Sequence, residues 1–236
     1  MRGSVLVMAK APVAGQAKTR LAAVAGDRGA AQLAAAALLD TLEAGAGAFP
    51  PGRRVLALAG DLRDACRADE IREAARGWLL VPQGGQTFGE RLVDGHAQAH
   101  RLAGGPVVQI GMDTPQVSAA LLRELAQEAH RRGGPVLGPA LDGGWWVLVT
   151  THSGQAAVLA GVPMSRPDTG RLTAAALAAE GHPAVEAVVL RDVDLPPDAE
   201  AVALQAPRTR FAATWRQLTE PGHDRSRSDA EGERAR

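Results

Sequence analysis

The sequence predicts an α/β protein whose mostly parallel sheet carries helices on both faces. Short apolar stretches alternate with longer helical patterns along most of the 236 residues. Parallel strands need helix-length crossovers, so this alternation is typical of parallel sheets. The chain is 46% hydrophobic and 22% charged, which supplies enough apolar residues for a sizeable core. Neither a fixed-period repeat nor a linker-like stretch occurs before about residue 206, so we expect one domain.

Seven apolar stretches predict the strands. The first, SVLVM, is short and continuously apolar, as expected of a strand that is buried on both faces of a sheet. The strands are expected at Ser4–Met8, Arg54–Ala59, Trp78–Val81, Pro106–Gly111, Val136–Pro139, Trp145–Thr150 and Val185–Leu190.

Helical patterns fill the segments between most of these strands. The first runs from Asp27 to about Ala46 and carries Leu33, Leu38 and Leu42 on one stripe. Ser118 is a favoured N-cap for a helix that runs to Arg132, and Pro197 is a favoured first residue for the last one. The other helices are expected at Leu62–Ala75, Glu90–Leu102 and Thr169–Glu180, and the last helix at Pro197–Gln205.

The predicted domain spans residues 1–205, and residues 206–220 form a C-terminal extension. The remaining stretch, residues 221–236, reads PGHDRSRSDAEGERAR. It contains four Arg balanced by four acids and no large apolar side chain, so it cannot bury an apolar face. We expect it to be a disordered tail.

Charge, cysteine content and hydropathy exclude several classes of protein. The formal net charge is zero, so no overall field draws the chain to nucleic acid or to an anionic membrane. Cys66 is the only cysteine, which excludes an internal disulfide and a multi-cysteine zinc site. VLVMA is too short for the core of a secretory signal, and no apolar stretch reaches the ~18 residues that cross a bilayer. We expect a cytoplasmic protein with neither nucleic acid nor membrane as a partner.

A loop of small residues and cations follows the first strand. It reads AKAPVAGQAKTRL and contains both lysines of the chain, Lys10 and Lys18, together with Arg20. Open parallel sheets bind ligands beyond the carboxyl ends of their strands, where this loop is expected. Small side chains let backbone N–H groups approach a ligand, and the cations favour phosphate. The alternative is a surface loop with incidental charges, because both the P-loop and G-x-G-x-x-G motifs are absent.

Asp113 lies in the turn MDTP, directly after the strand PVVQIG. If this strand neighbours the first one, the carboxylate lies beside the lysine loop. It could then hold Mg²⁺, which takes few protein oxygens and completes its shell with water and phosphate. The alternative is a turn-forming Asp before a proline.

A third cluster is GPALDGGWW, in which Asp142 precedes Gly143 and Gly144. The two glycines leave room for a ligand against the backbone. Trp145 and Trp146 then begin a strand, so their side chains point to opposite faces. Either one of them lines the pocket or both belong to the core.

The weaker candidates are a fourth acidic cluster and a histidine pair. RDVDLPPDAE places Asp192, Asp194 and Asp198 near the end of the last strand, where N-capping of a helix is the alternative role. His96 and His100 share a helix face, but HAQAH lacks the glutamate of a zinc-protease motif. We therefore disfavour a metal site at the histidines.

Five motifs resemble those of a known family in order and spacing, over a match from about Val5 to Val202. They are AKAPVAGQAKTRL, QGGQTFGERL, IGMDTP, GPALDGGWW and DVDLPPD. The chain resembles the radical-SAM/selenodomain-associated transferase 1 family, which has the GT-A fold of the nucleotide-diphospho-sugar transferase superfamily. A more distant likeness, mainly in the KTRL loop and Asp113, is to 2-phospho-lactate guanylyltransferase and molybdenum-cofactor guanylyltransferase.

The resemblance implies roles for particular residues. The donor nucleotide and its phosphates would be bound by Lys10, Gly15, Lys18, Thr19, Arg20, Gln83, Gly89 and Glu90. The acceptor would be bound by Asp142, Gly143, Gly144 and Trp146. The catalytic residues would be Asp113, Lys18 and Asp142, and the ligands of Mg²⁺ or Mn²⁺ would be Asp113 and Asp194. The chain departs from the family at Trp145 and Trp146, where tyrosines are usual, and at Leu195, where threonine is usual.

We therefore expect a divalent-metal-dependent transferase that uses a nucleotide donor, because cations and a metal neutralise charge on a leaving phosphate. The favoured reaction is glycosyl transfer from a nucleotide-diphospho-sugar to a small acceptor. The alternative is transfer of a nucleotide from a nucleoside triphosphate to a phosphorylated small molecule, with release of pyrophosphate. Glycosyltransferases of this fold usually carry a D-x-D motif, whereas the strand end here offers only Asp113, and this difference favours the alternative. A third possibility, from another class, is a nucleotide-binding regulator without catalytic activity.

Overall fold

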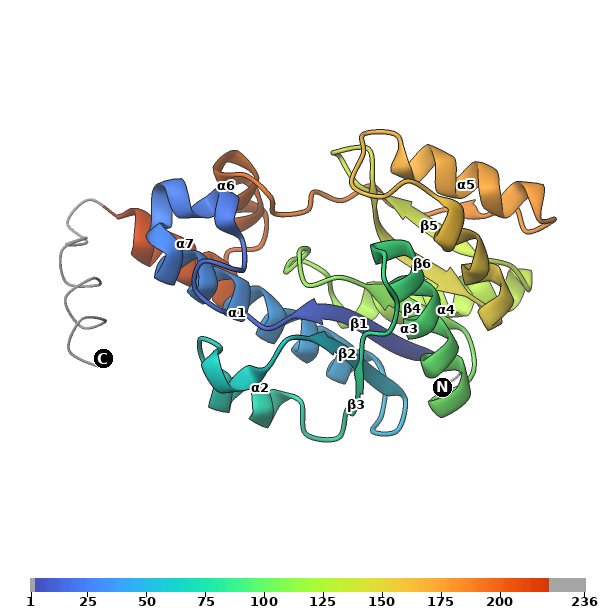
Figure 1. The fold of residues 1–236 in the computed structure, drawn as a ribbon, viewed down its shortest axis with the longest axis horizontal. Coiled ribbons are helices and arrows are strands. Elements are labelled where there is room, and N and C mark those ends of the chain that lie inside the picture. The colour runs from blue at the N-terminus through green and yellow to red at the C-terminus, as the bar shows by residue number, and fades with distance from the viewer. Residues whose placement is uncertain (1–2, 221–236) are drawn as a thin grey trace.

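The computed structural model describes residues 3–220, which are built around a seven-stranded sheet (Figure 1). The strand order is β3-β2-β1-β4-β6-β5-β7. Neighbouring strands run parallel except at β6, which is antiparallel to both β4 and β5. The mostly parallel sheet is therefore confirmed, with one reversed strand. The strands are β1 (Ser4–Lys10), β2 (Arg54–Ala59), β3 (Leu79–Pro82), β4 (Val107–Ile110), β5 (Val136–Pro139), β6 (Trp145–Thr150) and β7 (Val185–Glu186).

Helices cover both faces of the sheet, as the sequence predicts. The α-helices are α1 (Ala22–Ala48), α2 (Ala68–Ala74), α3 (Phe88–Leu102), α4 (Ala119–Arg132), α5 (Thr169–Ala179), α6 (Pro196–Gln205) and α7 (Arg210–Thr219). The 3₁₀ segments are η1 (Thr19–Leu21), η2 (Leu62–Asp64) and η3 (Ser153–Gly161). One apolar layer packs α1, α2 and α4 against the sheet, and a second packs α3, η3 and α5 against the other face.

Local chemistry explains several helix ends. The hydroxyl of Ser118 accepts a hydrogen bond from Leu121 N, as expected of the N-cap of α4, and Gly133 ends that helix with φ 66°. The prediction of one continuous helix over Leu62–Ala75 is wrong, because this segment forms the two separate elements η2 and α2. Arg67 has φ 55°, which separates η2 from α2.

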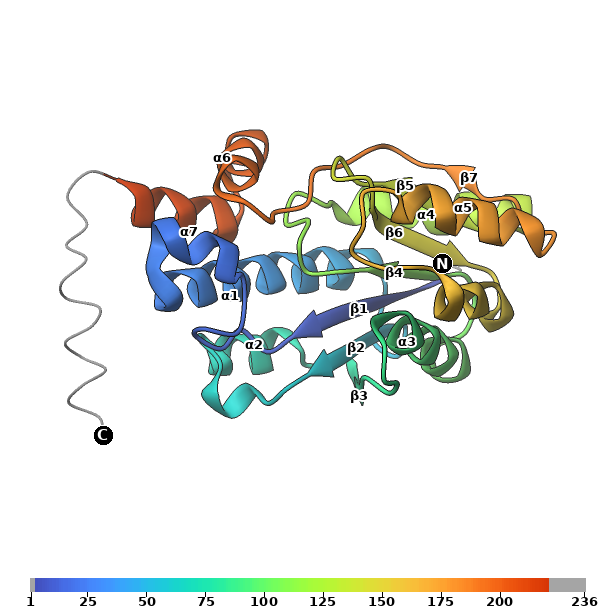
Figure 2. The ribbon, with the colours of Figure 1, turned by 45° about the horizontal axis from the view of Figure 1, so that its top comes forward.

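The chain after β7 returns across the edge of the sheet at which β1 and β4 end, and it then forms α6 and α7. Figure 2 shows these helices beside α1, at the end toward which β1 and β2 point. Phe211 and Trp215 of α7 are buried against α1, and the carboxylate of Asp40 accepts hydrogen bonds from Arg210 N and Phe211 N. The segment 206–220, expected as an extension, thus packs on the domain. The tail expected over 221–236 lies outside the described residues.

Within the described part of the chain, none of the helices combines the length and apolar character needed to span a lipid bilayer.

Candidate functional site

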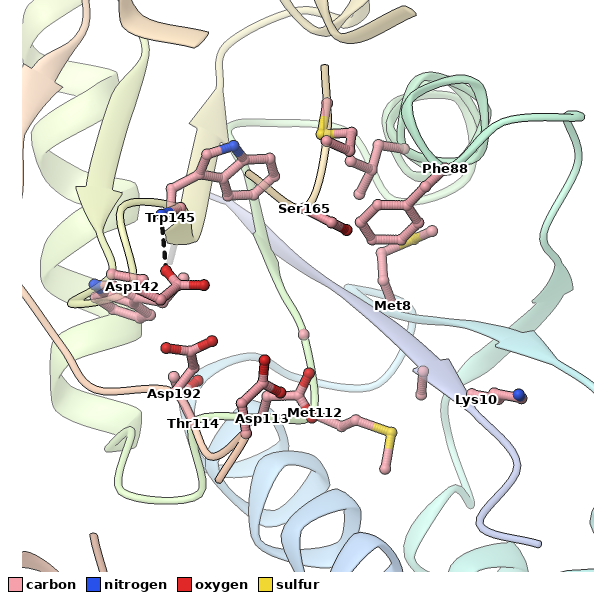
Figure 3. Close-up of a pocket in the computed structure, with 18 of the residues that line it drawn as sticks. Met8, Lys10, Phe88, Met112, Asp113, Thr114, Asp142, Trp145, Ser165 and Asp192 are labelled. Carbon is pink, nitrogen blue, oxygen red and sulfur yellow. Dashed lines mark hydrogen bonds between the residues drawn. The ribbon is translucent and has the colours of Figure 1, made fainter. Parts of the chain in front are cut away.

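A pocket of about 750 Å³ opens at the carboxyl ends of β1 and β4, where β6 begins (Figure 3). Its lining includes residues from all five motifs of the family resemblance: the lysine loop, the segment that begins at Gln83, the MDTP turn, the turn before β6 and the DVD segment after β7. Figure 3 shows an apolar side with Met8 and Phe88, and across from it a group of carboxylates. The fold therefore gathers these distant segments at one edge of the sheet, where open parallel sheets bind ligands.

Lys18 is the central cation of the pocket. Its Nζ lies 2.6 Å from Asp113 Oδ1 and 3.6 Å from Asp194 Oδ1, and it also donates to the carbonyl oxygen of Val193. The side chain is only 9% exposed. Arg20 lies nearer the solvent and forms an ion pair of 3.0 Å with Asp194 Oδ2. Two cations of the loop thus contact the acids that the sequence assigned to the metal.

The other three loop residues that were expected to bind the donor lie in different positions relative to the pocket. Lys10 borders the pocket and is exposed, and its Nζ donates to the carbonyl oxygen of Gln16 at 3.0 Å. Thr19 also borders the pocket. Gly15 is exposed in the turn of the loop and is not among the residues that line the pocket.

Two further carboxylates, those of Asp142 and Asp192, converge around Asp194. Ligand oxygens of Asp142, Asp192 and Asp194 all lie within 4.8 Å of one another. Burial raises the pKa of Asp192 to about 6, and repulsion from Asp142, Asp194 and Asp113 adds to the effect. A group of like charges that raises the pKa of one member is stabilised by a cation. Sequence reasoning noted Asp192 in RDVDLPPDAE but did not assign it to the metal, because only the folded chain places Asp142 beside it.

The turn before β6 shapes the same side of the pocket. Gly144 N donates to Asp142 Oδ1 at 2.7 Å, which orients the carboxylate. Gly143 has φ 89°, and a Cβ there would collide with the carbonyl oxygen of Pro167. Gly144 lines the pocket, whereas Gly143 is explained by this close approach of two loops.

The two tryptophans point to opposite faces, as expected. Trp145 is half-buried and donates Nε1–H to Thr173 Oγ1 at 3.2 Å, and Figure 3 shows its ring beside the cavity. Trp146 also borders the pocket, but it is 4% exposed, packs in the core with α1 and α4 and donates to Val188 O. Both tryptophans therefore border the pocket, Trp145 as a half-buried ring beside the cavity and Trp146 as a buried core residue.

The segment QGGQTFGERL contributes only one of its three expected residues, Gln83, to the lining of the pocket. Gln83 borders it, while its Nε2 donates to the carbonyl oxygens of Ala9 and Ala57 and so ties β1 to β2. Gly89 and Glu90 are not among the lining residues. A Cβ at Gly89 would collide with the carbonyl oxygen of Leu159 on η3, and Glu90 completes a capping box with Thr87. The structure thus explains Gly89 by the close packing of α3 against η3, and Glu90 by the capping of α3.

Sequence reasoning missed several lining residues. Phe88 and Arg91 come from the first turn of α3, and Ser165 and Arg166 come from the loop before α5. Arg91 stands directly after the expected pair Gly89-Glu90, so the motif marked the right segment. Nothing in the sequence places the loop before α5 at the pocket, because that contact depends on η3 and β6.

Residues 41–166 match the protein family DUF2064, described as "Uncharacterized protein conserved in bacteria". The matched segment covers more than half of the chain, and the protein belongs to this family. No curated protein matches the sequence closely enough to be called a relative.

Solved structures show which fold this family member shares. A protein from Desulfovibrio desulfuricans G20, named as a nucleotide-diphospho-sugar transferase, superposes with a TM-score of 0.75. It is 22% identical, over 92% of this chain and 95% of that one. A cytidylyltransferase from Leptospira borgpetersenii superposes with a TM-score of 0.56 at 13% identity, over 91% of this chain and 92% of that one. The chain therefore has the fold of nucleotide-diphospho-sugar transferases and cytidylyltransferases.

Proposed function

We propose that this DUF2064 protein is a divalent-metal-dependent transferase that moves a sugar from a nucleotide-diphospho-sugar to a small acceptor. The observation that carries the proposal is the meeting of Lys18 and Arg20 with Asp113, Asp142, Asp192 and Asp194 in one pocket. The cations can bind the phosphates of a donor, and the carboxylates can hold a metal ion that bridges those phosphates to the protein. The shared fold supports a nucleotide as the donor.

The donor phosphates would lie along the lysine loop. Lys18 and Arg20 are held by carboxylates in the structure, so they are already turned toward the pocket. A phosphate that enters beside them exchanges one anionic partner for another, which costs less than ordering a free side chain. Small residues of the loop leave backbone N–H groups accessible at the same place.

The acids suit Mg²⁺ or Mn²⁺, because these ions prefer carboxylate oxygens. The sequence assigned the ion to Asp113 and Asp194, and both lie within reach of the Lys18 ammonium. Asp142 and Asp192 add oxygens within 4.8 Å of Asp194. We propose that Asp113 and Asp194 hold the ion with help from these two once Lys18 turns to the phosphates. The bound ion would neutralise charge on the leaving phosphate.

The acceptor would bind on the β6 side, between Asp142 and Trp145. In the transfer, an acceptor hydroxyl oxygen forms a bond to the sugar carbon while the bond from that carbon to the phosphate oxygen breaks. The hydroxyl proton goes to a carboxylate, and Asp142 is oriented for this role by its hydrogen bond from Gly144 N. The nucleoside diphosphate leaves with the bonding electron pair.

Nucleotidyl transfer is the second candidate. It is favoured by the shared fold with cytidylyltransferases and with a CMP-sugar-acid synthetase solved with CTP, which superposes with a TM-score of 0.52. It is also favoured by the presence of Asp113, rather than a D-x-D motif, at the end of β4. In that reaction the acceptor phosphate attacks the α-phosphate of a nucleoside triphosphate, and pyrophosphate leaves.

The products distinguish the candidates. A thermal-shift panel of nucleotides and nucleotide sugars, with and without Mn²⁺, first identifies a donor, since a ligand at ~100 times Kd stabilises by ~2.7 kcal/mol. Turnover of that donor with a panel of small acceptors should then release a nucleoside diphosphate. Release of pyrophosphate would establish nucleotidyl transfer. Nucleotide binding with no turnover of any donor would establish a regulator.

A further inference from the structure

A row of buried polar side chains leads from α3 toward the pocket. Nε2 of His100 lies 2.8 Å from Thr150 Oγ1, and Nδ1 of His96 lies 3.0 Å from the same oxygen. Burial lowers the pKa of His96 to about 3 and that of His100 to about 4, so both rings are neutral at pH 7. Two neutral rings share one hydroxyl when one ring donates to its oxygen and the other accepts its hydrogen.

Gln109 is a polar side chain in the apolar layer between the sheet and α3. It pairs with Leu6 of β1 and Leu148 of β6, so its side chain lies on their face of the sheet, the face that α3 covers. It is 3% exposed and borders the pocket. A glutamine here is costly unless its amide has a polar partner.

The amide and the neighbouring ring both lack a complete set of partners. Among the described residues, neither Oε1 of Gln109 nor Nε2 of His96 has a partner with the geometry of a formed hydrogen bond. The Gln109 side chain is nevertheless close enough to raise the pKa of His96 slightly, against the larger effect of burial. A buried polar atom without a complete hydrogen bond is costly, and a ligand that completes the bond removes that cost.

We propose that Gln109 binds a hydroxyl group of the sugar carried by the donor nucleotide, and that His96 and Thr150 are positioning residues for its amide. When His100 donates to Thr150 and Thr150 donates to His96, Nε2 of His96 carries a hydrogen that faces Oε1 of Gln109. A small closing movement on ligand binding completes that bond. It fixes the amide with its NH₂ group toward the pocket, where a hydroxyl oxygen accepts.

The sheet order favours the sugar over the nucleoside as the group that Gln109 contacts. β4 lies between β1, which leads into the phosphate-binding loop, and β6, which begins at Trp145 on the acceptor side. A group bound over β4 therefore lies between the phosphates and the acceptor. In the transfer proposed above, that group is the sugar. The inference rests on the proposed function and deepens it.

The test compares each nucleoside diphosphate with its own sugar conjugate. Calorimetry in the presence of Mn²⁺ would use uridine, guanosine, adenosine and thymidine diphosphates and their glucose or mannose conjugates. In Gln109→Met, the extra affinity that the sugar supplies should fall about tenfold, the value of one buried hydrogen bond, while affinity for the diphosphate stays unchanged. Thr150→Val should lose part of the same preference, because it breaks the positioning of His96.

Gln155→Met is the matched control. Gln155 is 1% exposed, bonds to Thr151 and does not line the pocket, so its replacement should leave the sugar preference unchanged. Equal losses for diphosphate and conjugate in Gln109→Met would overturn the inference, and so would a full sugar preference in that variant. A wild-type protein that binds a diphosphate but gains nothing from the sugar would also overturn it, with the nucleotide site intact. Binding of none of the diphosphates would instead overturn the proposed function.

Discussion

The ammonium group of Lys18 lies 2.6 Å from the carboxylate of Asp113, although 95 residues separate them along the chain. This contact joins the loop after β1 to the end of β4, the two neighbouring strands at the centre of the pocket. It pairs the cation expected to bind phosphate with an acid expected to bind metal. In this structure each group neutralises the other.

Lys18→Ala should weaken nucleotide binding strongly. A charged hydrogen bond to phosphate is worth ~1.5–3 kcal/mol, so we expect a loss of about 10- to 150-fold in affinity, measured by calorimetry. Lys10→Ala is the control within the same loop, because the Lys10 ammonium is exposed and donates to the backbone carbonyl of Gln16. Its effect should be smaller. Unchanged nucleotide affinity in a folded Lys18→Ala protein would contradict the phosphate assignment.

The variant Asp113→Asn tests whether Asp113 is a metal ligand or only a turn residue. Asparagine serves a turn nearly as well as aspartate, but it removes an anionic ligand of Mg²⁺. We expect the gain in donor affinity on adding Mn²⁺ to shrink, and binding in chelator to survive through the loop cations. If the variant keeps the whole metal-dependent gain, Asp113 only shapes its turn and holds Lys18.

Trp146→Ala and Trp145→Ala should differ in kind. Trp146 is 4% exposed in the core, so its truncation should cost ~3–5 kcal/mol of unfolding free energy in urea denaturation. Trp145 is half-buried beside the cavity, and its truncation should mainly alter substrate binding. Two equally destabilised variants with normal substrate affinity would refute the pocket role of Trp145.

The buried histidine His96 should make the fold sensitive to acid. Burial, with a smaller contribution from His100, lowers the pKa of His96 from 6.5 to about 3. The folded ring stays neutral while the unfolded one takes up a proton below about pH 6.5, so stability is complete above that pH and is lost as the pH falls. For His96 the loss at pH 5 is about 2 kcal/mol.

Urea denaturation at pH 7 and pH 5 measures this loss. His96→Gln removes the titrating ring and should reduce the difference in unfolding free energy between the two pH values. The same difference in the variant and in the wild type would show that other groups cause the acid sensitivity.

The sequence predicted those parts of the fold that depend on neighbouring residues. SVLVM and PVVQIG became central strands, and Ser118 became an N-cap, because strand burial and capping leave a local pattern. The 3₁₀ segment Ser153–Gly161 and helix α7 were missed, since both are held mainly by contacts with distant helices. Thr209 caps α7 locally, but two backbone N–H groups of its first turn donate to Asp40, which lies 170 residues before Arg210.

The candidate site shows the same division. The motifs marked the right segments, because loops at strand ends must carry the polar residues of an open sheet. The roles of individual residues within these segments depend on contacts that only the folded chain makes. Gly89 and Gly143 are explained by close approaches to other loops, and Asp192 gains its raised pKa from burial beside Asp142. The sequence places Gln109 in a buried strand, and only the folded chain shows that it faces α3 and borders the pocket.

The most direct test of the proposed metal-dependent donor site is donor binding by calorimetry, with Mn²⁺ and with chelator, for the wild type and for Asp194→Asn. Asp194 contacts Arg20, lies 3.6 Å from the Lys18 ammonium and belongs to the cluster with Asp142 and Asp192. We predict that Mn²⁺ raises the affinity of the wild type for a nucleotide donor and that Asp194→Asn abolishes most of this gain. A wild type that binds its donor equally well in chelator, or a variant that keeps the full gain, would contradict the proposed role of Asp194 in metal-dependent donor binding.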